Sequence, residues 1–162
     1  MAERVRDVQS EDVITNALVT LVNQYPRLST GETISFGVLS EDGGISMFPM
    51  SGAVIERDAV DILGNHEQIC NYPFFVYYRV SGLTENRKVS VKEWLDDLGR
   101  WLEKQPITVG ETVYTLSAYP ALSGSRKFLT IKRTTPASLD SVGKGQEENW
   151  AIRLVARYQN NF

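Results

Sequence analysis

Two adjacent carboxylates are the first candidates for chemistry in this 162-residue sequence. Asp96 and Asp97 lie in a segment with helical spacing, which places them about 100° apart on the polar side of the predicted helix. Carboxylate pairs can perform general acid and base catalysis, but charged side chains also commonly cover a solvated helix face. An ion pair between Asp96 and Arg100, four residues on, accounts for the first of them. We therefore expect a solvated helix face and assign no catalytic residue.

Metal-ligating and nucleophilic side chains are scarce. His66 is the one histidine and Cys70 the one cysteine, four residues apart. Two ligands do not complete a zinc site, and a single histidine leaves no Ser-His-Asp relay that spacing can select. We expect a surface histidine and a buried cysteine. The sequence thus predicts no metal and no cofactor, and a lone cysteine excludes a disulfide within the chain.

Patterns that bind phosphate or nucleic acid are equally weak. The Gly-Lys-Gly sequence at 143–145 lacks the preceding glycine and the following Ser or Thr of a phosphate-binding loop, so we expect a flexible loop. Four cations lie on or near a predicted strand without the interleaved exposed aromatics on which bases stack. They are Arg126, Lys127, Lys132 and Arg133. Charge that protects an edge strand from aggregation explains them as well.

The stretch 73–102 must organise the fold around these residues. Its first part, 74–80, is apolar on both faces, which favours a central strand covered on both sides. A polar loop at 81–89 follows. Apolar residues at 91, 94, 95, 98, 101 and 102 then repeat with helical spacing. Ser90 and Glu93 form the predicted capping box of this helix, and Pro106 stops it.

The remaining elements follow from the same rules. A first helix is predicted from Ser10, its N-cap, to about Gln24, where Tyr25-Pro26 ends it. Strands at 34–38 and 45–50, joined by a glycine turn at 41–44, predict a hairpin, and Pro49 places it at an edge or on an arm. Further strands are predicted at 113–116, 128–133 and 150–159, whereas 52–60 is strand or loop and 62–69 is ambiguous.

These elements favour an α+β fold: a single largely antiparallel β-sheet packed with two α-helices, plus a projecting β-hairpin around 34–50. We expect one domain over 1–162, with three tryptophans in its core. They are Trp94, Trp101 and Trp150. Three apolar residues of the hairpin are the candidate contact with another subunit or a tube, with packing on the parent domain as the alternative. They are Met47, Phe48 and Met50.

Charge is unevenly distributed along the chain. Residues 1–120 carry 10 Lys and Arg against 17 Asp and Glu, hence −7, and residues 121–162 carry 7 against 3, hence +4. Unlike surfaces suit head-to-tail stacking of copies, and scatter without spatial segregation is the alternative. No apolar run approaches the roughly 18 residues of a spanning helix, and the charged N-terminus is no signal peptide. We therefore expect no membrane association and a reducing cytoplasm.

Several stretches resemble the tail-terminator proteins of long-tailed bacteriophages, often labelled minor capsid or tail completion proteins. The stretches are 72–79 (YPFFVYYR), 94–95 (WL), 98–99 (LG), 101–102 (WL), 118–120 (AYP), 133–137 (RTTPA), Trp150 and 158–162 (YQNNF). Together they cover roughly the C-terminal half of the chain, and none of them is a catalytic motif. The N-terminal half resembles these proteins only in the order of its elements.

The resemblance implies a structural assembly protein and not an enzyme. It implies a homohexameric ring that caps the tail tube, ends its polymerisation and joins it to the head connector, with DNA passing through the hole. Such a protein belongs to the virion at the head–tail joint, after assembly in the host cytoplasm. We expect an acidic or neutral lumen, because basic side chains would hold phosphates. Two alternatives remain: a nucleic-acid-binding module that uses the basic C-terminal quarter, and a small enzyme without a recognisable motif.

Overall fold

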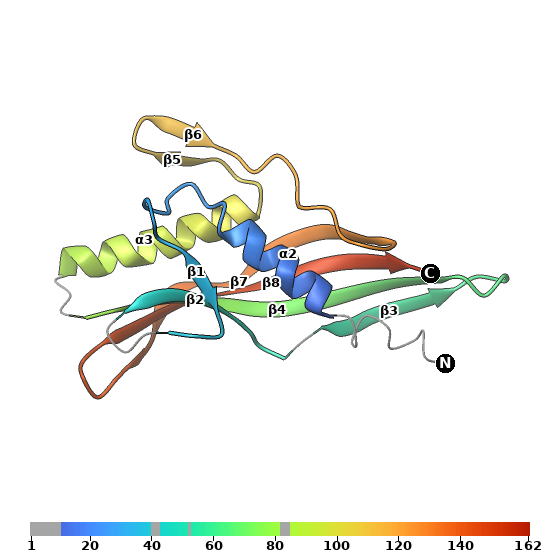
Figure 1. The fold of residues 1–162 in the computed structure, drawn as a ribbon, viewed down its shortest axis with the longest axis horizontal. Coiled ribbons are helices and arrows are strands. Elements are labelled where there is room, and N and C mark those ends of the chain that lie inside the picture. The colour runs from blue at the N-terminus through green and yellow to red at the C-terminus, as the bar shows by residue number, and fades with distance from the viewer. Residues whose placement is uncertain (1–10, 40–42, 52, 82–84) are drawn as a thin grey trace.

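The computed structural model describes residues 11–39, 43–51, 53–81 and 85–162. It contains a large, mostly antiparallel sheet with both helices on one face (Figure 1). The elements are α2 (Glu11–Val22), β1 (Ile34–Phe36), β2 (Gly44–Pro49), β3 (Val54–Val60), β4 (His66–Val80), α3 (Glu85–Leu102), β5 (Ile107–Val109), β6 (Thr112–Tyr114), β7 (Arg126–Val142) and β8 (Glu148–Asn161). The strand order is β1-β2-β4-β8-β7, and β3 also pairs with β4. The predicted α+β class is confirmed.

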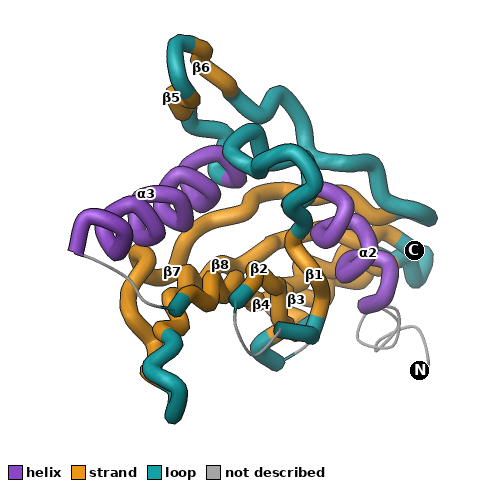
Figure 2. Tube along the Cα trace, turned by 60° about the vertical axis from the view of Figure 1, so that its left-hand side comes forward, coloured by secondary structure: helices purple, strands orange, loops and turns teal. Residues whose placement is uncertain are grey.

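β4 is the central strand that the aromatic run predicted. It pairs with β8 along its whole length, and on its other side it pairs with β3 and then with β2. Tyr72, Phe74 and Val76 point to the helix side of the sheet and are fully buried. Phe75 and Tyr77 point to the opposite face, called here the open face, and are half-buried. Both helices and the β5–β6 hairpin lie on the side away from the open face (Figure 2).

Pro73 lies in the middle of this central strand although it has no N–H for a ladder. Its carbonyl accepts the backbone N–H of Met50 at 2.9 Å, so the nitrogen of Pro73 faces the same side of β4. On that side, β2 ends opposite Phe74 and β3 begins opposite Asn71. The missing donor therefore falls where β4 changes from one neighbour to the next, which is why proline is tolerated there.

α3 is longer than predicted. It begins at Glu85, so Ser90 lies inside the helix, and both the capping box and the predicted loop over 85–89 are wrong. The apolar spacing identified only the part that packs on the sheet, because Arg87, Val89 and Ser90 are exposed and form no apolar stripe. The first helix agrees with its prediction within two residues, and its expected N-cap, Ser10, lies outside the described residues.

The hairpin predicted over 34–50 is wrong. β1 and β2 pair in parallel, with Ile34 opposite Ile45, and β2 lies within the sheet between β1 and β4. The chain must therefore run back after β1 before it enters β2, where an antiparallel pair needs only a tight turn. Alternating polarity does not distinguish these two connections. Part of the predicted turn, residues 41 and 42, lies outside the described residues.

Pro49 nevertheless obeys the rule from which its edge position was predicted. β1 pairs only with residues 45–47 of β2, so the described part of β1 does not reach Pro49. β4 covers the other side of β2 at this position, with Phe74 opposite Pro49. The strand is thus interior at its start and an edge strand at its end, which accommodates a residue without a backbone donor.

Two further hairpins extend beyond the predictions. β7 runs to Val142, well beyond the end of the strand predicted at 128–133. Four register shifts interrupt its pairing with β8, and such bulges break the alternation by which a strand is recognised in sequence. The predicted strand at 113–116 is β6 at 112–114. It pairs with β5, which was not predicted, and the two project from the helix side of the sheet (Figures 1 and 2).

The aromatic core lies between α3, the loop after α2 and the sheet. Trp94 and Trp101 are buried as predicted, and Trp94 makes edge contacts with Tyr25 and Tyr78 at ring separations of 4.9 and 5.1 Å. Trp150 was assigned to the core, but it is half-buried and packs at the margin of the core. Trp150 lies near the start of β8, opposite Tyr78 of β4.

Candidate interaction surfaces

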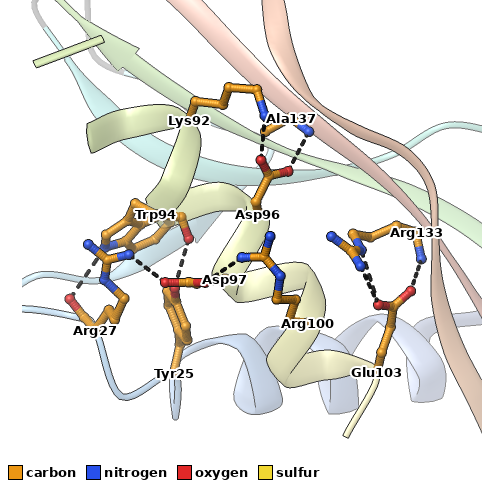
Figure 3. A network of polar contacts seen from close by, with 10 residues as sticks. All are labelled: Tyr25, Arg27, Lys92, Trp94, Asp96, Asp97, Arg100, Glu103, Arg133 and Ala137. Carbon is orange, nitrogen blue, oxygen red and sulfur yellow. Dashed lines mark hydrogen bonds and ion pairs between the residues drawn. The ribbon is translucent and has the colours of Figure 1, made fainter. Parts of the chain in front are cut away.

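Asp96, the first of the two candidate catalytic carboxylates, anchors α3 to the sheet (Figure 3). It is buried, and its two oxygens accept the backbone N–H of Ala137 on β7 at 2.7 Å and Nζ of Lys92 at 2.6 Å. The predicted pair with Arg100 is wrong, and so is the placement of Asp96 on a solvated face. A buried carboxylate with a backbone donor and an ammonium group has its hydrogen-bonding capacity directed into the fold.

Asp97 points away from Asp96, toward the loop after α2 (Figure 3). Its oxygens accept from Arg27 and Arg100, each at 2.7 Å. The Trp94 indole N–H donates to the Arg27 carbonyl at 3.3 Å, and the Tyr25 hydroxyl donates to the Trp94 carbonyl at 2.7 Å. The two aspartates therefore serve different contacts and do not face a common substrate position.

The basic C-terminal quarter is not segregated in space from acidic side chains. Arg133 pairs with Glu103 at the end of α3, and Arg157 pairs with Glu56 on β3. Arg153 pairs with Asp140 at 2.8 Å. At least three of the seven cations in 121–162 thus form ion pairs, two of them with acids from the acidic part of the chain. At these positions, basic residues of the C-terminal quarter therefore pair with acidic residues of the same subunit. Moreover, β7, which carries the other predicted basic residues, is an edge strand as expected.

An aromatic cluster lies on the open face. Phe48 and Phe75 stack at 5.3 Å, and Tyr77 contacts both rings at 5.7 and 4.7 Å. The Tyr77 hydroxyl donates to Asp140, which also accepts from Arg153. Burial, together with the hydrogen bond and the charge of Asp140, raises the pKa of Tyr77 to about 12. The hydrogen bonds from Tyr77 and Arg153 lower the pKa of Asp140.

The three residues predicted to contact another subunit are divided between different environments. Met47 is fully buried in the core, so its assignment to a surface contact is wrong. Alternation along β2 directs Met47 to the helix side and Phe48 to the open face. Phe48 is half-buried, and Met50 beyond the strand end is 49% exposed. The contact predicted for these two residues stays a prediction.

Within the described residues, eight of the twelve large exposed apolar side chains lie on three hairpins, and Phe36, Val38, Met50 and Val89 lie elsewhere. The eight are Val54, Val60, Ile62 and Leu63 on β3–β4, Val113 and Tyr114 on β5–β6, and Leu139 and Val142 on β7–β8. The turns that end β3–β4 and β7–β8 lie at opposite ends of the long axis of the molecule (Figure 1). Apolar groups clustered at the surface of a protein mark interaction sites more often than single ones do.

The β3–β4 turn, residues 61–65, is the most exposed of these sites. Ile62 is completely exposed and Leu63 is 82% exposed. The Asp61 carboxylate accepts the backbone N–H groups of Leu63 and Asn65 at 2.8 and 2.9 Å, and the Asn65 side-chain amide at 2.9 Å. These hydrogen bonds lower the pKa of Asp61, those from Asn65 most. An aspartate followed by Gly-Asn is a sequence signal for such a turn. Gly64-Asn65 lies within the segment 62–69, whose structure the sequence left ambiguous, and Asp61 directly precedes that segment.

His66 and Cys70 differ in burial and in their contacts. Cys70 is fully buried, as predicted. His66 is half-buried and not a surface residue, because its ring stacks on Phe162 at 4.8 Å and its Nδ1 lies 2.8 Å from the Asp58 carboxylate. Within the described residues, no group of three His, Cys, Asp or Glu side chains is placed to hold a metal ion.

The Gly-Lys-Gly sequence forms the turn between β7 and β8. The Gly143 N–H donates to the Glu147 carbonyl at 2.8 Å, which closes the turn. It lies between antiparallel strands and not between a strand and a helix, the context that a phosphate-binding loop requires.

Comparison with known proteins adds no relatives. A scan against models of protein families finds no match to the chain, and a search of curated proteins finds none either. Across 11–39, 43–51, 53–81 and 85–162, no helix is long and apolar enough to cross a membrane. The hairpins, the open face and the sequence stretches described above are the features that bear on function.

Proposed function

We propose that this chain is a structural assembly protein whose copies form a ring on a bacteriophage tail tube. The ring caps the tube, ends its polymerisation and joins it to the head connector, and it needs no catalytic step. The observation that carries the proposal is the placement of exposed apolar side chains on two hairpins that point to opposite ends of the molecule. The stretches that resemble tail terminators point to the same class of protein.

Two unlike contact sites at opposite ends favour head-to-tail association. When one end of a subunit binds a different end of the next, copies form a closed ring if the rotation closes, and a filament if it does not. β4, with 15 residues, spans about 50 Å at the usual rise per strand residue. Each subunit therefore supplies a rigid spacer between its two contact sites.

The other partners follow from the architecture of such an assembly. One face of the ring contacts the tail-tube protein, the opposite face contacts the connector, and DNA passes through the lumen without sequence-specific contacts. The lumen is acidic or neutral in this proposal, because a basic lining would retain phosphates. Arg133, Arg153 and Arg157 are already paired with carboxylates, which reduces the positive potential that a nucleic-acid-binding module would need.

The test is assembly with and without the tube. The protein at low salt, and a second sample mixed with tail-tube protein, are measured by mass photometry and electron microscopy. We expect closed rings in solution or at tube ends, and tubes that stop growing when the protein is added. Monomers in both samples, with tubes that elongate as before, would overturn the proposal.

A further inference from the structure

We propose that three side chains from α3, its C-terminal end and the loop after β6 close the outer edge of β7 against strand addition by a second copy of this chain. Within the described residues, β7 is the last strand of the sheet and pairs only with β8. The three side chains, called here the capping side chains, are Asp96, Glu103 and Tyr119. This inference does not depend on the proposed ring, because it concerns a contact that the folded subunit prevents.

Two of the capping side chains accept backbone N–H groups from alternate residues of β7. The Tyr119 hydroxyl accepts from Ile131 at 3.2 Å, and Glu103 Oε2 accepts from Arg133 at 3.0 Å. Neither acceptor belongs to β8, so both N–H groups point away from the rest of the sheet. In an antiparallel sheet, these are the donors that an added strand would use.

These two donors lie in the most regular part of β7. Four register shifts interrupt its pairing with β8, and the longest run of consecutive pairs between them is 130–133. An added strand needs an unbroken row of backbone groups, so the shifts already disfavour strand addition along the rest of β7. Asp96 accepts from Ala137 at 2.7 Å within one of the interrupted parts. Register shifts and capping side chains therefore protect complementary parts of the same edge.

Glu103 and Tyr119 are themselves held in place by several contacts. Glu103 Oε1 accepts from Nε and Nη2 of Arg133 at 3.0 and 2.9 Å, which fixes the carboxylate against β7 (Figure 3). The Tyr119 hydroxyl donates to the Leu102 carbonyl at the end of α3 at 2.7 Å. Lys104 Nζ lies 4.4 Å from the centre of the Tyr119 ring. The caps are therefore part of the folded subunit and need no partner to form.

The partner that these caps exclude is the same edge of a second copy. Along an antiparallel edge, alternate residues present both an N–H and a C=O group to the outside. Two identical edges related by a two-fold axis therefore match donors with acceptors. The run 130–133 meets this condition as soon as its donors lose their side-chain acceptors.

Hydrogen exchange at the two amides tests the inference. The double variant Glu103→Ala with Tyr119→Phe removes both acceptors at Ile131 and Arg133. In dilute protein, the two amide protons should exchange roughly tenfold faster than in wild type, because water reaches an uncapped edge. In concentrated protein, their protection should return as edges of two copies pair, and light scattering should detect the associated species. Wild type should show the same protection at these amides at both concentrations.

Three control variants identify the edge and exclude a general loss of stability. Arg133→Pro, added to the double variant, removes an outward N–H and obstructs an incoming strand, so this triple variant should not associate. Glu103→Gln keeps an oxygen that can accept the Arg133 N–H and should resemble wild type. Leu21→Ala creates a cavity under α2 and leaves the caps in place. It should lower the urea midpoint without making exchange at Ile131 depend on protein concentration.

Each outcome supports or overturns the inference. Protection that returns with concentration in the double variant and is lost again in the triple variant would support it. Fast exchange at both amides without association, up to the limit of solubility, would show that the open edge does not bind a second copy. Equal association of Leu21→Ala or of the triple variant would assign it to unfolding or to another surface, and would overturn the inference. Should the double variant fail to fold, Tyr119→Phe removes a single hydroxyl and is tested in the same way at Ile131.

Discussion

The α3 anchor and the β3–β4 turn use the same interaction for opposite purposes. In the anchor, buried Asp96 accepts a backbone N–H from β7 and joins two elements across the core. In the turn, exposed Asp61 accepts two backbone N–H groups from its own neighbours, and these bonds add to the backbone hydrogen bonds that close the turn. Asp96 stabilises the interior, and Asp61 stabilises a turn whose apolar side chains are exposed to water.

The difference shows that a hydrogen bond can order one segment without contributing to the stability of the whole fold. Breaking a contact in the core leaves a cavity or a buried group without its partner, and the whole fold loses stability. Loss of a contact in an exposed turn changes only the local ensemble, because water replaces the missing partner. A binding surface needs a defined conformation. Local hydrogen bonds can supply that conformation without raising the free energy of unfolding of the subunit.

The largest effect is expected at Trp94. Trp94→Ala removes a buried ring that contacts Tyr25 and Tyr78 and should lower the free energy of unfolding by about 3–5 kcal/mol. Urea unfolding followed by circular dichroism measures the loss. Trp150→Ala is the control, because that ring is only half-buried and should cost clearly less. Equal losses in the two variants would contradict the division into core and margin.

The anchor itself should show an intermediate effect. Asp96→Ala leaves the backbone N–H of Ala137 buried without its acceptor, and a loss of about 1–3 kcal/mol is expected. Asp96→Asn keeps an oxygen acceptor for that N–H and loses only the charge opposite Lys92. Asp96→Asn should therefore lower the free energy of unfolding by less than half as much as Asp96→Ala. An asparagine variant as unstable as the alanine variant would assign the effect to the ion pair instead.

The open face should respond to alkaline pH. Tyrosine ionises near pH 10 in an unfolded chain, and the pKa of Tyr77 is raised to about 12. A raised folded-state pKa contributes stability that is complete below pH 10 and is lost as the pH rises through 12. Urea midpoints at pH 9 and pH 11.5 should fall further for wild type than for Tyr77→Phe. Parallel curves would show that Tyr77 is not held in its protonated form.

The smallest effect on stability is expected at the turn. Asp61→Ala should leave the urea midpoint unchanged, but the amide protons of Leu63 and Asn65 should exchange faster with solvent. The lowered pKa of Asp61 means that this protection is present at neutral pH and is lost as the pH falls through the lowered value. Nuclear magnetic resonance measures both. A variant that unfolds at lower urea would place the turn in the cooperative core and weaken the comparison.

Much of the fold was predictable because burial leaves a periodic signal. The apolar spacing at 91–102 identified the packed part of α3, and the two-sided apolar run at 74–80 identified the centre of the sheet. The parallel pairing of β1 with β2 left no such signal, because alternation indicates a strand without naming its partner. The length of β7 was concealed by its own register shifts.

The candidate contact surface was less predictable than the fold. Met47, Phe48 and Met50 were selected for their apolar character, yet alternation along β2 buries the first of them. Ile62 and Leu63 are as apolar as any core pair, and only the turn chemistry around them shows that they are exposed. Whether an apolar residue faces the core or a partner depends on pairing across the sheet, which a single sequence does not state.

The interrupted pairing of β7 has a consequence for the aggregation of this protein. A strand of 17 residues at the edge of a sheet would normally be a template for strands of other molecules, and growth along that route leads to fibres. Four register shifts break the regular row of backbone groups that such growth requires. The shifts therefore make β7 a poor template for strand addition by another molecule.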